Sequence, residues 1–495
     1  METITDDACY LALKARDARF DGSFFTGVTS TGIYCRPVCR VKTPRRENCR
    51  FFPHAAQAER AGFRPCLRCR PELAPHAITW SIQDASYILA HQAARLLDEP
   101  EAWAGETPTV ELLAGRLGVS DRHLRRIFEA TFGVSPLQYL QTRRLLTAKQ
   151  LLADTDLPVT QVALASGYNS VRRFNAAFLE HYGLNPTALR KEGARSAGQG
   201  TGVKLGFRPP YDVEAMLGFF RKRRIAGIDH AAAEGDAPAI GRTVRIESGG
   251  AVHSGWVMGT FDAQRSLVDL RVSDSLRDVL PLVIRRFRAM LDLDADPMQV
   301  NAVLHESFPH GDGLRVPGTM DGYELAVRAV LGQQITVAAA RTLAQRLVDR
   351  FGEPIETPHE NLTRLFPAAS VLAQATGDGL GQLGIVRQRQ AAIVAIAKAC
   401  SQGGLKLHPG AEVESTIAAL KELPGIGDWT AQYIAMRALR WPDAFPAGDI
   451  ALQKSLGVAS AKEAAAASHG WKPWRSYAVI RAWYAPQPVS SSATT

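Results

Sequence analysis

Apolar residues recur every three to four positions through much of the first 190 residues, a period typical of helices. Regular patterns of this kind begin at residue 84 and continue, with short polar breaks, to residue 178. The segments expected to be helical are 84–97, 109–117, 121–128, about 136–152, 159–166 and 169–178. The pattern therefore predicts a helical region of short elements around one longer helix.

Within this region, two similar helix–turn–helix units flank the longer helix. Each unit turns at a glycine, Gly118 in the first and Gly167 in the second. Two such units on one linker helix can reach successive segments of a DNA major groove. A plain helical bundle is the alternative. The candidate DNA contacts are the polar residues of each second helix: His123, Arg125, Arg126, Ser170, Arg172 and Arg173.

The pattern changes after a Gly/Ser-rich stretch around residues 192–206, which is expected to be a flexible linker. A helix is expected over 213–224, and alternating runs at 243–246 and 267–272 predict strands. These elements indicate a small α/β lobe. From residue 297 onward the apolar spacing is helical nearly throughout, including 323–331 and 337–351.

Residues 423–429 (Leu-Pro-Gly-Ile-Gly-Asp-Trp) join two of these helical patterns through a Gly-x-Gly turn. Such a turn predicts a helix–hairpin–helix, in which Gly425 and Gly427 let the backbone approach a DNA phosphate at a helix N-terminus. A lone acid, Asp449, follows on a Pro/Gly-rich loop. A phosphate clamp beside a single carboxylate indicates chemistry on a nucleotide. Asp449 could also simply cap a helix that begins near Ile450.

Five of the seven cysteines lie in a short N-terminal block. Four of them have the spacing Cys35-x3-Cys39 and Cys66-x2-Cys69, which suits a tetrahedral zinc ion. A purely structural zinc site is the alternative. Nine Lys/Arg against two Glu in this segment favour contact with phosphates. The fifth cysteine, Cys49, is not expected to be a ligand.

Length and charge extend this picture. A chain of 495 residues is too long for one core, and a net charge of +9 with a pI near 9.2 favours a polyanionic partner. No apolar run is long enough for a membrane helix, and the acidic N-terminus does not suit a signal peptide. We therefore expect a cytoplasmic, nucleoid-associated bacterial protein.

Residues 31–39 (Thr-Gly-Ile-Tyr-Cys-Arg-Pro-Val-Cys) and 62–69 (Gly-Phe-Arg-Pro-Cys-Leu-Arg-Cys) closely resemble the N-terminal domain of the Ada family. The resemblance implies that Cys35 is both a zinc ligand and the acceptor of a methyl group from a DNA phosphotriester. Cys39, Cys66 and Cys69 would complete the ligand set, and Arg64 would contact DNA. The second helix–turn–helix unit, ending in Tyr-Gly-Leu-Asn-Pro at 182–186, resembles AraC-type regulators, so RNA polymerase is an expected partner.

Residues 205–485 resemble the AlkA branch of the alkylbase DNA glycosylases. Among the matching motifs are Arg-Pro-Pro-Tyr-Asp at 208–212 and Trp-Lys-Pro-Trp-Arg-Ser-Tyr-Ala at 471–478. The resemblance implies that Asp449 is the catalytic aspartate, that an extruded base stacks on Trp483 and that Tyr433 lines the pocket. Gln334 stands where the family inserts a leucine wedge into DNA. Gly448 replaces a second aspartate, so one carboxylate is expected.

The sequence thus predicts a multidomain, mainly α chain that combines a small zinc domain, a double helix–turn–helix, and an α+β lobe joined to a helical helix–hairpin–helix glycosylase. The expected boundaries are 1–80, 81–194, a linker at 195–204, 205–296, 297–486 and a disordered tail at 487–495. The expected function is excision of alkylated purines such as 3-methyladenine, together with methylation-dependent activation of repair genes. No lysine stands between Asp449 and Lys454, which favours a monofunctional hydrolase. The alternative is a DNA-binding regulator with an inactive glycosylase-like half.

Overall fold

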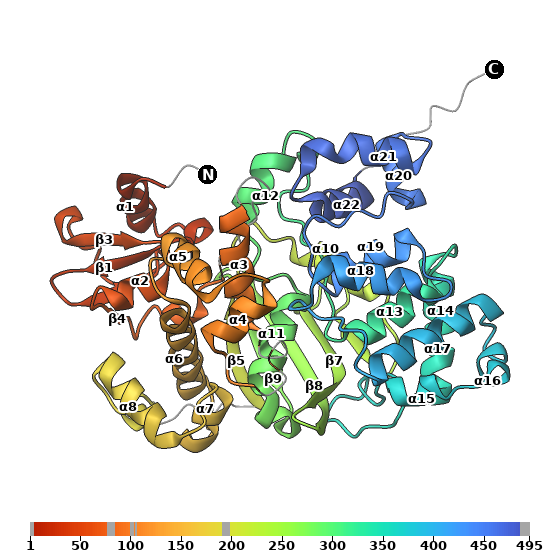
Figure 1. Cartoon of the computed structure of the whole chain (residues 1–495), viewed down its shortest axis with the longest axis horizontal. Coiled ribbons are helices and arrows are strands. Elements are labelled where there is room, and N and C mark those ends of the chain that lie inside the picture. The colour runs from red at the N-terminus through yellow and green to blue at the C-terminus, as the bar shows by residue number, and fades with distance from the viewer. Residues whose placement is uncertain (1–3, 77–84, 100–102, 104–105, 191–198, 486–495) are drawn as a thin grey trace. The chain divides into compact units, whose positions relative to one another are not determined.

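The computed structural model of the chain describes residues 4–76, 85–99, 103, 106–190 and 199–485 (Figure 1). It divides into two compact units. The first is built from residues 1–209, 237–288 and 293–295, and the second from 210–236, 289–292 and 296–495. The tail expected at 487–495 lies outside the described residues, and the finer domain boundaries stay predictions.

The first unit begins with a small sheet in the strand order β3-β1-β2-β4, in which β2 and β4 are parallel. Phe25, Tyr34, Phe52 and Phe63 pack with alanines of a short helix to form its core. The elements of this region are α1 (Asp6–Ala15), η1 (Ala18–Phe20), β1 (Phe25–Val28), β2 (Ile33–Cys35), η2 (Arg46–Asn48), β3 (Cys49–Phe52), α2 (Ala55–Arg60), β4 (Arg64–Pro65) and η3 (Pro71–Leu73).

Helices follow, as the apolar period predicts. Ser120 and Ser170 cap the N-termini of α5 and α8, and Gly133 and Gly183 end them with positive φ, so the two helices are built alike. Helix α5 runs past the predicted end because Phe132 is also buried. The helices are α3 (Ala85–Asp98), α4 (Val110–Arg116), α5 (Asp121–Phe132), α6 (Pro136–Asp154), α7 (Val159–Ala165), α8 (Val171–Tyr182) and α9 (Pro186–Leu189).

The first unit also contains an antiparallel sheet in which β5, β9, β8 and β7 lie in that order. Its elements are β5 (Thr201–Gly206), β7 (Ala239–Ser248), β8 (Ala251–Asp262), β9 (Leu267–Val272), η5 (Asp274–Val279) and α11 (Leu280–Met290). Strand β5 shows that the linker predicted at 195–204 is wrong over its last residues. Val203 and Leu205 are buried and pair with β9, an alternation that the surrounding glycines obscured in the sequence.

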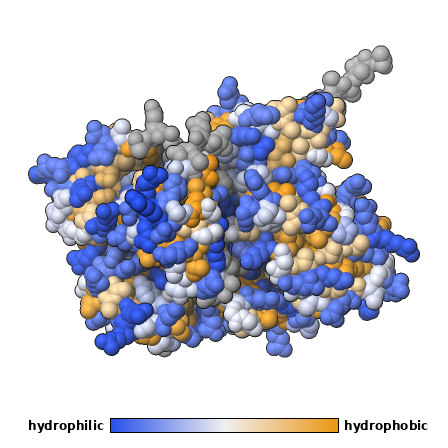
Figure 2. Space-filling view, viewed as in Figure 1, coloured by the Kyte–Doolittle hydropathy of each residue, from blue (hydrophilic) through white to orange (hydrophobic). Residues whose placement is uncertain are grey.

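The second unit is mainly helical, and α14 has the predicted bounds. Its elements are α10 (Val213–Lys222), β6 (Asp229–Ala231), α12 (Pro297–Leu304), α13 (Gly322–Leu331), α14 (Val337–Phe351), α15 (Ala369–Ala373), α16 (Gly377–Gly381), α17 (Arg387–Ser401), α18 (Val413–Glu422), α19 (Asp428–Arg437), α20 (Ile450–Leu456), α21 (Ala461–Ala467), η6 (Ser468–Trp471) and α22 (Arg475–Tyr484). Hydrophilic residues dominate the face drawn in Figure 2. In the described part of the chain, none of the helices combines the length and the hydropathy that crossing a bilayer requires.

Candidate functional site

Four cysteine sulfurs from two separated segments converge beside the N-terminal sheet. Cys35 ends β2 and Cys66 follows β4, and the parallel pairing of these strands places the two residues side by side. Cys39 and Cys69 come from the adjoining loops, and all four Sγ atoms lie within 4.8 Å of one another. Zinc–sulfur bonds of about 2.3 Å separate tetrahedral ligands by about 3.8 Å. The four side chains therefore fit a zinc ion.

Hydrogen bonding within the cluster divides the four thiols into two pairs: it raises the pKa of Cys35 and Cys69 and favours the thiolate, the form in which cysteine binds zinc, at the other two. Hydrogen bonds with the Cys35 thiol lower the pKa of Cys39 to about 7 and also lower the pKa of Cys66. The backbone N–H of Arg36 donates to Cys69 Sγ at 3.3 Å. A bound zinc ion would take the place of the protons that the sulfurs share.

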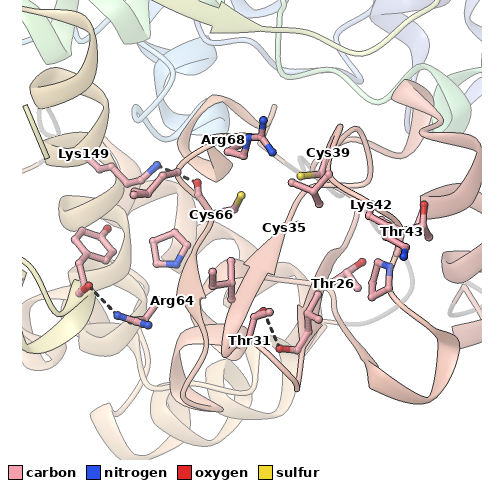
Figure 3. A pocket seen from close by; sticks show the side chains of 18 of the residues that line it. Thr26, Thr31, Cys35, Cys39, Lys42, Thr43, Arg64, Cys66, Arg68 and Lys149 are labelled. Atoms are coloured by element: carbon pink, nitrogen blue, oxygen red, sulfur yellow. Dashed lines mark hydrogen bonds between the residues drawn. The ribbon is translucent and has the colours of Figure 1, made fainter. Parts of the chain in front are cut away.

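A cavity of about 480 Å³ adjoins the cluster, and Figure 3 shows the sulfur atoms of Cys39 and Cys66 facing it. Three exposed cations, Lys42, Arg64 and Arg68, line the cavity together with the buried Lys149. The rest of its lining is largely apolar and includes residues beyond the end of α8. An uncharged alkyl group carried on a phosphate backbone suits this combination of apolar wall and peripheral positive charge.

Two residues of the cysteine segment have structural partners instead. Arg36 is buried, pairs with Asp21 and donates to the Cys69 carbonyl oxygen at 3.0 Å. The basic density predicted as a phosphate surface therefore does not include Arg36. Cys49 is buried outside the cluster, and its thiol donates to a backbone carbonyl at 3.3 Å, in agreement with its expected exclusion from the ligand set.

Glu59 is a buried carboxylate that links the zinc region to the helix–turn–helix units. It accepts hydrogen bonds from Tyr34 Oη at 2.8 Å, Thr142 Oγ1 at 2.5 Å and His181 Nε2 at 2.5 Å. These partners lie in β2, α6 and α8. Burial alone would lower the pKa of His181, but its hydrogen bond to Glu59 raises the pKa overall. Three residues distant in sequence thus donate hydrogen bonds to the same carboxylate, and the bond from His181 fixes α8 against the zinc region.

We expect Glu59→Ala to lower the free energy of unfolding of this region by about 3 kcal/mol, because removal of one partner leaves buried polar groups unpaired. The measurement is the urea concentration at which the zinc-loaded chain releases zinc to a chromogenic chelator. Glu47→Ala is the matched control, since the Glu47 side chain is 71% exposed. Equal midpoints for the two variants would contradict the role assigned to Glu59.

The second helices of both helix–turn–helix units present the predicted cations to solvent. Arg125, Arg126, Arg172 and Arg173 are exposed. Arg126 lies 3.1 Å from His123 Nδ1, and Arg125 pairs with Glu111 at 3.4 Å. The side chain of Ser170 is occupied as the N-cap of α8. The four arginines are therefore accessible to DNA, whereas the Ser170 side chain caps a helix.

In the second unit, Asp449 lies between two indole rings. Trp429 Nε1 donates to Asp449 Oδ2 at 2.9 Å, and Trp483 Nε1 donates to Oδ1 at 3.1 Å. The backbone N–H of Leu452 also donates to Oδ1 at 2.8 Å, so Asp449 is the N-cap of α20 as well. Three N–H donors hold this carboxylate in place. Capping and a chemical role are therefore compatible.

Aromatic rings from two helices meet beside this carboxylate. Trp429 and Tyr433 stack with centroids 5.4 Å apart, and Tyr433 lies 6.5 Å from Trp483 at an angle of 41°. The sequence predicts Tyr433 and Trp483 as site residues but does not predict the contact of Trp429 with Asp449. Its position one helical turn before Tyr433 was the available signal. All three rings are partly buried, so each keeps some accessible surface.

The hairpin and the α13–α14 turn are tied together. Gln333 Nε2 donates to the Gly425 carbonyl and to Thr430 Oγ1, both at 2.9 Å. Gln334 is exposed with a φ of 54°, a backbone conformation that non-glycine residues rarely adopt. At Gly427, the N-cap of α19, an added Cβ would meet nothing within 4 Å. The space beside Gly427 is therefore open to an approaching phosphate, whereas an added Cβ at Gly425 would lie 3.4 Å from Ala392 Cβ.

Comparison with protein families matches four successive segments. Residues 8–72 match the metal-binding domain of Ada, and residues 113–192 match a helix-turn-helix domain. Residues 202–321 match the AlkA N-terminal domain, and residues 327–471 match the HhH-GPD superfamily of base excision DNA repair proteins.

A probable bifunctional transcriptional activator/DNA repair enzyme AlkA of Mycobacterium tuberculosis is 37% identical over 493 residues, covering 96% of each chain. The chain belongs to this family of AlkA-type bifunctional transcriptional activator/DNA repair enzymes. DNA-3-methyladenine glycosylase 2 of Escherichia coli is 31% identical over 57% of this chain and 96% of its own. The bifunctional transcriptional activator/DNA repair enzyme Ada of the same organism is 35% identical over 39% of this chain and 51% of its own.

These matches confirm the resemblances to Ada and AlkA and the predicted fold class, and the metal of the four-cysteine cluster is zinc. The chain binds DNA through helix–turn–helix and glycosylase regions. The roles of the individual residues stay predictions.

Proposed function

We propose that the chain repairs alkylated DNA in two ways and reports the damage to transcription. Its C-terminal half excises alkylated purines such as 3-methyladenine by hydrolysis of the N-glycosidic bond. Its N-terminal region takes a methyl group from a DNA phosphotriester onto Cys35 and then activates repair genes. The observation that carries the proposal is the Asp449 carboxylate held by two indole N–H groups beside stacked aromatic rings.

In excision, the damaged nucleotide is flipped out of the duplex, at a cost of a few kcal/mol that is smallest for damaged pairs. The electron-poor base stacks against the ring of Trp483 in a pocket lined by Tyr433, which favours cationic purines over ordinary ones. As the bond to the base breaks, positive charge develops on the sugar. The carboxylate of Asp449 stabilises this charge and orients the attacking water.

Asp449 acts mainly through its charge. Both carboxylate oxygens already accept hydrogen bonds, which hold the group in place without reorganisation during the reaction. The indole N–H groups of Trp429 and Trp483 therefore serve as positioning donors. A base that leaves with a positive charge needs little protonation, so no strong general acid is required.

In the N-terminal region, the Cys35 thiolate attacks the methyl carbon of a phosphotriester. A carbon–sulfur bond forms as the carbon–oxygen bond breaks, and the released phosphodiester carries the negative charge. The four cysteines would hold the zinc ion, which would keep their sulfurs deprotonated and still nucleophilic. Transfer removes one negative charge from the site, so its repulsion of the DNA backbone falls.

Weaker repulsion allows the helix–turn–helix units to remain on promoter DNA. Arg125, Arg126, Arg172 and Arg173 would supply phosphate and base contacts there, and Arg64 and the hairpin glycines would contact DNA near the two reacting sites. RNA polymerase is the expected protein partner of the promoter-bound chain. Because DNA is the substrate of every step, we place the chain in the bacterial cytoplasm at the nucleoid.

The proposal is tested by incubating the full chain with DNA that contains 3-methyladenine and quantifying the free base by chromatography. Release of free 3-methyladenine supports an enzyme. Tight binding of the same DNA without release would support the second candidate, a regulator whose C-terminal half only binds DNA.

A further inference from the structure

A buried arginine of the second unit contacts the hydroxyl group of Tyr433. Arg437 stands one helical turn after Tyr433 on α19 and is 6% exposed. Its Nη1 donates to the Tyr433 hydroxyl oxygen at 2.5 Å. Its Nε donates to the Pro317 carbonyl at 2.8 Å, and its Nη2 donates to the Gly318 carbonyl at 3.1 Å. The guanidinium is therefore held on three sides.

This arrangement fixes the direction of one proton. A guanidinium group only donates hydrogen bonds, so the Tyr433 oxygen is the acceptor in its bond with Arg437. The hydroxyl hydrogen of Tyr433 therefore points away from Arg437. Burial alone would raise the pKa of Tyr433, but the charges of Arg437 and then Arg223 lower it below its usual value. The hydroxyl is thereby a stronger hydrogen-bond donor.

The value of such a donor depends on the charge of the departing base. A cationic alkylated purine leaves as a neutral molecule and gains little from a hydrogen bond. An uncharged purine accumulates negative charge as it leaves, and a hydrogen bond to that charge stabilises its transition state. The positive charge of Arg437, 5.3 Å from the Tyr433 ring centroid, also opposes the binding of a cationic base.

We propose that Arg437 is a positioning residue that directs the Tyr433 hydroxyl toward the extruded base and so sets how well uncharged purines are released relative to cationic ones. The proposal rests on the excision activity proposed above. Both groups that the proposal needs, the Tyr433 hydroxyl and the Arg437 guanidinium, belong to this chain. The hydrogen bond to the base does not have to transfer its proton, so no other group has to replace that proton.

The test measures single-turnover release from two duplexes, one with 7-methylguanine as a cationic base and one with hypoxanthine as an uncharged base. We expect Arg437→Gln and Tyr433→Phe each to lower hypoxanthine release by about tenfold, the effect of one hydrogen bond lost from the transition state. Release of 7-methylguanine should stay within about threefold of wild type in Arg437→Gln, since the opposing charge is also removed.

Two further variants separate a directed hydrogen bond from general damage to the fold. The double variant Arg437→Gln/Tyr433→Phe should release hypoxanthine no more slowly than Tyr433→Phe alone, because Arg437 acts through that hydroxyl. Arg437→Lys should recover part of the lost release, because it keeps a cationic donor. Arg350→Gln, an exposed arginine on α14, is the matched control and should behave as wild type.

An equal fall in release of both bases in Arg437→Gln would overturn the proposal, as would a further loss in the double variant. If Arg437→Gln fails to fold, hypoxanthine release by Tyr433→Phe tests the proposal instead, since this variant removes only the hydroxyl group. Wild-type release of 7-methylguanine but not hypoxanthine would overturn this inference alone. Release of neither base would overturn the excision activity as well.

Discussion

Asp449→Asn should lower the rate of base release roughly 100- to 1000-fold, the loss expected when a charged group that stabilises the transition state is removed. Asparagine keeps the size of the side chain but loses its charge. It also has one side-chain oxygen for the two indole donors of Trp429 and Trp483. Single-turnover release of 3-methyladenine, with all DNA bound, measures the effect on chemistry alone.

DNA affinity provides the comparison for this variant. We expect the dissociation constant of Asp449→Asn for DNA to equal that of the wild type within about threefold, since contacts of basic groups with the DNA phosphates supply most of the affinity for DNA. Asp428→Asn is the matched control. Asp428 is an exposed acid at the start of α19 that pairs with Lys421, and its loss should leave base release intact. Full activity in Asp449→Asn would refute the proposed role of Asp449.

Cys35→Ala should abolish methyl transfer from DNA phosphotriesters. The variant removes the only sulfur proposed to attack the methyl carbon, so uptake should fall from one methyl group per chain to none. Mass spectrometry of the intact chain and of its peptides measures the stoichiometry and the position of the methyl group. Base release should be unaffected, because Cys35 and Asp449 lie in different units.

Cys49→Ala is the matched control for methyl transfer. Cys49 is buried in the same small sheet but lies outside the four-sulfur cluster, so this variant should accept one methyl group and bind zinc as the wild type does. A methyl group found on Cys39, Cys66 or Cys69 in the wild-type chain would contradict the choice of Cys35.

The helical regions could be predicted because one physical signal dominates them. Burial of one face produces the apolar period in α5, α6 and α14, and serine caps mark where α5 and α8 begin. The cysteine cluster could be predicted for a similar reason, because zinc ligands require fixed residue types at short spacing. In the helices the determining contacts are local in sequence, and in the cluster each cysteine pair is closely spaced although the two pairs come from separated segments.

The parts that could not be predicted depend on contacts between distant segments. Strand β5 contains Gly202 and Gly206 and is defined by its pairing with β9, so its composition looks like that of a linker. The bond from Trp429 to Asp449 exists because a loop carries the acid back to α19. The spacing of apolar residues along the sequence does not indicate that the chain returns to α19 in this way. The shared charge of Glu59 joins three elements in the same way.

The claim that two chemistries reside in one chain is tested most directly by counting both products in one reaction. The purified zinc-loaded chain is incubated with excess DNA that carries methylphosphotriesters and 3-methyladenine. Free base and methylated protein are then quantified over time. We expect base release to continue far beyond one equivalent per chain, whereas methylation should stop at one methyl group on Cys35. Absence of free base, or methylation without a limit of one per chain, would contradict that claim.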